Sequence, residues 1–195
     1  MRPIMTRFAP ALSLVFVCNA LPALAQQMVL ELDPGQTRVE FTLGDVLHTV
    51  HGTFKMKRGE MRIDPATGKA TGELIIDATS GDSGSGARDS RMHKNILESG
   101  KYPAIALTPD RFDGKLNLQG DSEVQLHGQF GIHGSQHEIT LPVKVHIREQ
   151  QLEADTQFPV PYQKWGMKNP STFILRVDDT VQIQIHAVGR LSPPP

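Results

Sequence analysis

The sequence predicts an all-β protein whose antiparallel sheet closes on itself as a barrel, with one short helical insert near residues 87–98. Apolar and polar residues alternate along almost the whole chain after the leader, and turn residues separate the alternating runs. A period of two is typical of strands with one buried face. A sheet with one apolar face must close on itself or pack against a second sheet, and we favour closure.

The first 25 residues have the pattern of a cleavable signal peptide. Arg2 and Arg7 supply the positive start, the apolar run 11–17 follows, and residues 23–25 (Ala-Leu-Ala) suit signal peptidase. The run is too short to span a bilayer. Cleavage would remove Cys18, the only cysteine, which excludes disulfides, thiolate metal sites and a cysteine nucleophile. We expect export to a bacterial periplasm, the alternative being a retained anchor.

The remaining chain is sized and charged like one ordinary domain. Without the leader and its two arginines, 170 of the 195 residues remain, with 18 basic and 21 acidic side chains. This balance argues against a nucleic-acid partner. We expect a domain over residues 26–191, followed by a disordered tail at residues 192–195.

Six alternating runs give the clearest strands, and the sequence contains enough further segments for nine or ten strands in a meander. Turn chemistry at 64–68, 113–114, 119–121 and 134–135 separates the runs. The opposite face is charged, which argues against a barrel surrounded by lipid. The apolar faces are Val39, Phe41, Leu43; Val50, Phe54, Met56; Leu74, Ile76; Val124, Leu126, Phe130, Ile132; Ile139, Leu141, Val143, Val145, Ile147; and Val181, Ile183, Ile185, Ala187.

The stretch 81–100 departs from the alternation. A Gly/Ser loop leads into it, and Asp82 or Ser83 is expected to cap the helix that follows. Met92 and Ile96 lie four residues apart with Leu97 beside them, which predicts a short helix with one apolar stripe. Such an insert plugs or covers one end of a barrel, or serves only as a surface connector.

Four passages, in order along the chain, carry a resemblance to a known family. They are Leu32-Asp33-Pro34 before Thr37–Phe41, then Val50–Phe54, then Arg88-Asp89 through Leu97 to Lys101–Ile105, and finally Gly128–Gly134 with Ile139–Val143. In this order and spacing the chain resembles the YceI-like lipid- and polyisoprenoid-binding proteins. The resemblance implies an extended lipocalin-like barrel whose apolar interior holds a polyprenyl phosphate or the tail of a quinone as ligand, with no cofactor.

The resemblance and the inward face together suggest which residues line the interior. For each of these residues the alternative is ordinary core packing. The expected partner is an isoprenoid lipid, with transient contact to a membrane surface or a membrane redox protein. The candidate lining residues are Phe41, Leu43, Phe54, Met56, Leu74, Ile76, Met92, Ile96, Leu97, Leu126, Phe130 and Trp165.

The segment 158–170 departs from the family, which often has an R-x-D-F-G-like stretch there. It contains Trp165 and several prolines, which we expect to keep it out of a strand ladder. It is either a packed structural loop or a lid or headgroup site, with Lys164 or Lys168 facing a phosphate.

Catalytic and metal-binding functions find little support in the sequence. The Gly81–Gly84 loop is similar to the surroundings of a serine nucleophile, but no partner histidine motif accompanies it. His133 and His137 flank a turn near Glu138 without a convincing third metal ligand. We therefore expect no enzyme and no metal. A second function class remains, a stress-associated or structural barrel that docks on a membrane redox partner; a filled interior would favour it.

Overall fold

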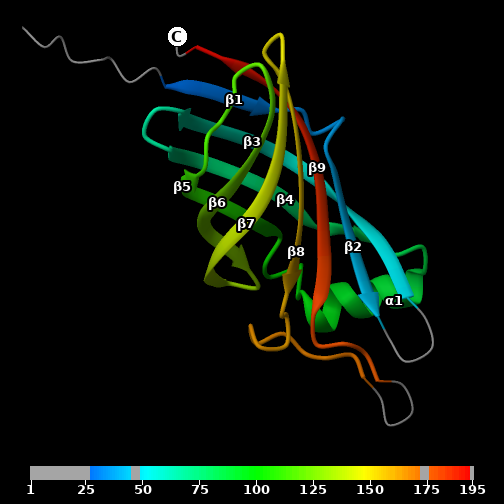
Figure 1. The fold of residues 1–195 in the computed structure, drawn as a ribbon. Coiled ribbons are helices and arrows are strands. Elements are labelled where there is room, and N and C mark those ends of the chain that lie inside the picture. Colours follow the sequence, from blue (N-terminus) through cyan, green and yellow to red (C-terminus); the bar gives the residue numbers. More distant parts are fainter. Residues whose placement is uncertain (1–26, 45–48, 172–175, 194–195) are drawn as a thin grey trace, which may run out of the picture.

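The computed structural model describes residues 27–44, 49–171 and 176–193 (Figure 1). The expected signal peptide lies outside this part of the chain, as do residues 194 and 195. The elements are β1 (Met28–Leu32), β2 (Arg38–Gly44), β3 (Thr49–Asp64), β4 (Lys69–Asp82), α1 (Gly86–Arg91), a π-helical segment (Met92–Ile96), β5 (Ala104–Asp113), β6 (Gly120–Ile132), β7 (Ser135–Arg148), β8 (Gln151–Val160) and β9 (Val181–Ser192). Because β9 includes Ser192, the expected disordered tail does not begin there.

The nine strands form one closed antiparallel sheet, which confirms the predicted barrel. The order β3-β2-β9-β8-β7-β6-β5-β4 returns to β3 through the pairing of β3 with β4. The short strand β1 pairs with β3 and β9, which are also the two neighbours of β2, but it pairs with other residues along them. β1 and β2 therefore act as one interrupted strand, and the barrel wall has eight positions.

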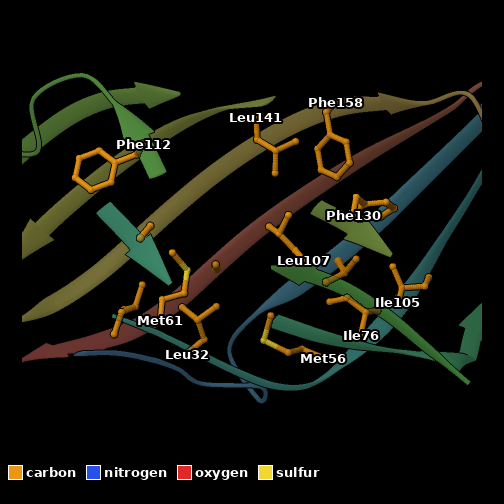
Figure 2. Close-up of a cluster of buried hydrophobic side chains, with 14 of the residues drawn as sticks. Leu32, Met56, Met61, Ile76, Ile105, Leu107, Phe112, Phe130, Leu141 and Phe158 are labelled. Atoms are coloured by element: carbon orange, nitrogen blue, oxygen red, sulfur yellow. The ribbon is translucent and has the colours of Figure 1, made fainter. Parts of the chain in front are cut away.

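Buried apolar side chains line the end of the barrel away from α1. Ile147 and Leu191 are each 1 % exposed, and Phe112 is buried beside them in the same core. Figure 2 shows buried side chains from both parts of the barrel interior, with Met56, Ile76 and Ile105 from adjacent strands lying together. Ile75, which interrupts the alternation in the sequence, lies opposite Arg58 where a bulge shifts the register of β3 against β4. This core lines one end of the barrel, and the insert shapes the other.

The insert lies across the other end of the barrel (Figure 1). The predicted helix is present, but the predicted cap is wrong: Asp82 ends β4, and the N-cap residue is Ser85, which makes no side-chain cap bond. Ser83 instead anchors the insert, since its amide donates to Asp89 Oδ1 (2.9 Å) and its hydroxyl accepts from Arg88 Nε (2.7 Å). The π-helical segment is fixed through His93, whose Nε2 lies 2.9 Å from the carbonyl oxygen of Gly81. No helix in the described ranges is long and apolar enough to cross a bilayer.

The barrel wall is split between β7 and β8. The paired stretch runs from Arg148, opposite Gln151, to Val143, opposite Thr156. Beyond Val143 and Thr156, β7 pairs only with β6, and β8 pairs only with β9. Pro142 and Pro159 lie on the two separated edges. A proline cannot donate to a ladder and is tolerated at an edge. The expectation that prolines exclude the whole segment 158–170 from a strand is wrong, because Pro159 pairs with Gln182 inside β8.

Candidate functional site: a cavity inside the barrel

A cavity of about 520 Å³ occupies the end of the barrel that α1 covers. This volume lies within the range of small-molecule sites, roughly 300–1,000 Å³. Its wall is formed by the inward faces of β2 to β6, β8 and β9, together with the insert and the loop after β8. The apolar lining from the strands includes Val39, Phe41, Leu43, Val50, Phe54, Ile76, Ile105, Phe130, Ile132, Phe158, Val160, Val181, Ile183 and Ile185.

Most of the lining residues suggested by the sequence border this cavity, and four do not. Leu74 and Leu126 border a second, smaller cavity deeper in the barrel. Met56 is buried in the core and borders neither cavity, and Trp165 packs outside the lining. The candidates that border the main cavity are Phe41, Leu43, Phe54, Ile76, Met92, Ile96, Leu97 and Phe130.

The deeper cavity has a volume of about 110 Å³ and an apolar lining broken only by Thr156. Ile185 on β9 borders both cavities, so they follow one another along the barrel axis. On β4, Ile76 borders the main cavity and Leu74 the deeper one. On β5, Ile105 borders the main cavity and Leu107 the deeper one. The lumen thus contains two apolar cavities that are separated by a constriction.

Aromatic rings stiffen the wall of the main cavity. The ring centroids of Phe41 and Phe54 lie 5.4 Å apart, and those of Phe130 and Phe158 lie 5.9 Å apart in an edge-on arrangement. Such pairs contribute about 0.5–1.5 kcal/mol beyond their burial. The wall offers an apolar ligand a firm surface for dispersion contacts and few hydrogen-bonding groups.

The loop after β8 supplies lining residues that the sequence did not single out. Tyr162 and Met167 are buried and border the cavity. The Tyr162 hydroxyl donates to the carbonyl oxygen of Asp178 (2.5 Å). Burial, with the nearby Asp179 and Asp178 carboxylates, raises the pKa of Tyr162 to about 12. The phenol is therefore a neutral, fixed part of the wall. In the sequence, the aromatic, proline-rich composition of the loop was the one feature that could have indicated lining residues here.

Trp165 packs beside the split in the wall. Its indole stacks on the His137 imidazole of β7, with ring centroids 4.1 Å apart and planes 5° apart, and lies 5.8 Å from the Phe130 ring. Burial lowers the pKa of His137, and its Nε2 has no hydrogen-bond partner among the described residues. The loop thus attaches to β7 through an uncharged stack, next to the split where β7 and β8 no longer pair.

The charged groups at the cavity come from the insert. Arg88 and Arg91, with Ser83 and Ser85, border the cavity, and no carboxylate is among its described lining residues. Lys164 and Lys168, which the sequence suggested could face a phosphate, do not border it. The two cationic side chains that border the cavity therefore come from a different segment than the one expected.

Within the described ranges, no three His, Cys, Asp or Glu side chains are grouped closely enough to hold a metal ion. His133 and His137 have separate neighbours: His133 Nε2 lies 3.7 Å from Glu98, whereas His137 stacks on Trp165. Neither histidine borders the cavity.

A closed antiparallel barrel with an apolar lumen and a helical insert over its mouth narrows the possible families, and sequence comparison decides among them. The profile of the YceI-like domain matches residues 30–189, almost the whole described chain. The chain belongs to the YceI-like family. No significant match is found among curated proteins.

Solved structures show the same YceI-like fold. BcnA of Burkholderia cenocepacia is 20% identical with a TM-score of 0.69, covering 80% of this chain and 98% of its own. A polyisoprenoid-binding domain from Saccharophagus degradans, implicated in plant cell wall breakdown, is 17% identical with a TM-score of 0.66, covering 85% and 98%. A YceI protein of Campylobacter jejuni is 16% identical with a TM-score of 0.61, covering 74% and 86%. At these identities the likeness establishes the fold.

Proposed function

We propose that this protein is a periplasmic, non-catalytic carrier or reservoir that holds the tail of an isoprenoid lipid or quinone inside its barrel. The observation that carries the proposal is the cavity of about 520 Å³, whose lining is almost entirely apolar and continues toward a second apolar cavity. The likeness to a polyisoprenoid-binding domain supports an isoprenoid in particular. The leader sequence supports the periplasm.

The energetics favour a protein carrier for such a molecule. Each buried methylene contributes about 0.8 kcal/mol, so a long isoprenoid tail has almost no free concentration in water. An eight-position barrel is just wide enough to be filled by side chains or to hold one small ligand. Here the side chains leave a cavity of about 520 Å³ at the α1 end and a smaller one of about 110 Å³ deeper in the barrel. Movement at Ile185, which borders both cavities, would let a longer tail reach the deeper one.

The second function class, a filled structural or stress-associated barrel docking on a membrane redox partner, is not favoured by a specific observation. A filled barrel would be packed throughout to the density of protein interiors, and this barrel contains a cavity within the range of ligand sites. Catalysis would need convergent polar groups at the reacting centre. The polar groups of the cavity are instead confined mainly to the insert at its mouth.

Transfer from vesicles tests the proposal. The protein, incubated with vesicles carrying a fluorescent isoprenoid lipid and then separated by sedimentation, should retain about one lipid per barrel in the supernatant. Vesicles carrying an equal amount of a labelled diacyl phospholipid are the control for non-specific extraction of lipid. Failure to extract the isoprenoid, with the barrel folded by circular dichroism, would contradict the proposal.

Replacing Trp165 with alanine should speed ligand loss at least fivefold. The substitution removes two ring contacts, with His137 and Phe130, that together contribute about 1–3 kcal/mol. Without them the loop should leave the split between β7 and β8 more often. Dissociation of a preloaded fluorescent isoprenoid into excess vesicles measures the rate. Trp165→Phe keeps an aromatic ring and should stay within about twofold of the wild type; an unchanged rate in Trp165→Ala would show that the loop does not retain the ligand.

A further inference from the structure

The split between β7 and β8 lies in the part of the wall that surrounds the main cavity. Beyond Thr156, β8 keeps its ladder with β9 as far as Val160, and β7 keeps its ladder with β6. No residue of β7 borders the main cavity, so its wall passes from β6 directly to β8. Widening the split would therefore break no ladder hydrogen bond, whereas parting β8 from β9 would break several.

Aromatic rings bridge the split in place of a ladder. Phe130 on β6 contacts Phe158 on β8 and Trp165 in the loop after β8, with ring centroids 5.9 and 5.8 Å apart. His137, the partner of Phe130 on β7, stacks on Trp165 at 4.1 Å. Burial of apolar rings is non-directional, so these contacts can separate and form again without losing a specific hydrogen-bond partner.

The loop after β8 is bonded to its own side of the split. Its hydrogen bonds include those from the Tyr162 hydroxyl to the carbonyl oxygen of Asp178 and from Asn169 Nδ2 to the carbonyl oxygen of Val177 (3.2 Å). In the described part of the chain, none of its hydrogen bonds reaches β6 or β7. The loop is therefore joined to β7 through ring contacts and can separate from it together with β8.

The insert at the end of the barrel is held more firmly than this loop. His93 is bonded through both ring nitrogens, with Nε2 2.9 Å from the carbonyl oxygen of Gly81 and Nδ1 3.0 Å from the hydroxyl of Ser99. The anchor between Ser83 and Asp89 adds further hydrogen bonds. Lifting the insert would break these bonds, whereas widening the split would separate apolar contacts.

We infer that the tail of the ligand enters and leaves the barrel sideways, through the split between β7 and β8, when the Trp165 loop separates from β7. The inference rests on the proposed carrier function and adds the route by which the cavity is loaded. Phe130 and Phe158 border the cavity and meet across the split, so their separation would open the lumen along its side. A tail could then pass in along its length, without threading past the insert.

A reversible chemical bridge across the split tests this route. His137→Cys with Trp165→Cys places one thiol on each side, which a short bis-methanethiosulfonate reagent joins and a reductant releases. All proteins carry Cys18→Ser, which removes the only native cysteine. Exchange of a fluorescent isoprenoid lipid between protein and vesicles is followed before bridging, after bridging and after reduction, with bridging measured by mass spectrometry and folding by circular dichroism.

Glu98→Cys with His133→Cys is the matched control. His133 Nε2 lies 3.7 Å from Glu98 Oε2, so a bridge there joins the insert to the turn between β6 and β7. Neither residue borders the cavity. This bridge holds the insert down and leaves the split free to widen.

Bridging the split should slow exchange about tenfold or more in both directions, and reduction should restore it, while the control bridge should change the rate by less than about twofold. If the first variant does not fold, Glu138→Cys with Lys164→Cys, exposed neighbours of the stacked residues, gives the same test with both rings in place. Unchanged exchange across a bridged split, or equal slowing by the control bridge, would overturn the lateral route and leave the carrier function standing. Failure of the wild type to take up lipid would overturn both.

Discussion

Replacing Ile183 with tryptophan is expected to abolish isoprenoid retention, with at least a tenfold loss of lipid bound from vesicles. Ile183 on β9 borders the main cavity. It pairs with Phe41 on β2 and with Phe158 on β8, both of which also border the cavity. An indole at this position would project into the lumen and take the space that the tail needs. Because that space is a cavity, the cost in stability should stay near the lower end of the ~1–3 kcal/mol typical of overpacking.

The same substitution one residue earlier gives a matched control. Gln182 precedes Ile183 on β9 and points to the exposed outer face of the barrel. Gln182→Trp adds the same ring to the same strand without entering the cavity, so it should bind lipid like the wild type. If Ile183→Trp retained lipid while remaining folded, the tail could not occupy the main cavity.

Truncating Ile147 to alanine should destabilise the protein by about 2–5 kcal/mol, the range for burying a new void in a packed core. Ile147 is 1 % exposed, pairs with Leu152 on β8 and borders neither cavity. For a domain of this size the change corresponds to a fall in melting temperature of about 4–20 °C. Denaturant or thermal unfolding followed by circular dichroism measures it.

Ile183→Ala is the comparison that links this prediction to the cavity. Its side chain already faces the cavity, so its removal enlarges existing space and forfeits fewer contacts than the loss of Ile147. We expect a clearly smaller destabilisation, with lipid still bound. Equal losses for the two variants would mean that the α1 end is packed as tightly in solution as the opposite end.

The sequence predicted the barrel because period-two alternation depends only on which face of each strand is buried. That signal covers Val39 to Ala187 and needs no knowledge of which strands are neighbours. The split between β7 and β8 depends on pairing, so the sequence could not show that Pro142 and Pro159 lie on the two separated edges. For the same reason, the alternation could not predict that β1 and β2 share their neighbours and form one interrupted strand.

The same distinction explains the site. Phe41, Phe54 and Phe130 were correctly placed on the inward face, and all three border the main cavity. Leu74 lies on that face too but reaches the deeper cavity, because position along the barrel axis is not encoded in alternation. Arg91 was not singled out in the sequence, because only the fold of the insert across the end of the barrel brings it to the lumen.

The central claim is that the lumen carries an isoprenoid, and mass spectrometry of organic extracts tests it most directly. The protein should be purified without detergent from its own source, and the extract compared with that of Ile183→Trp prepared in the same way. We predict a near-stoichiometric isoprenoid lipid or quinone in the wild-type extract and its absence from the variant. A wild-type extract free of isoprenoid, and still free after incubation with isoprenoid vesicles, would contradict the claim.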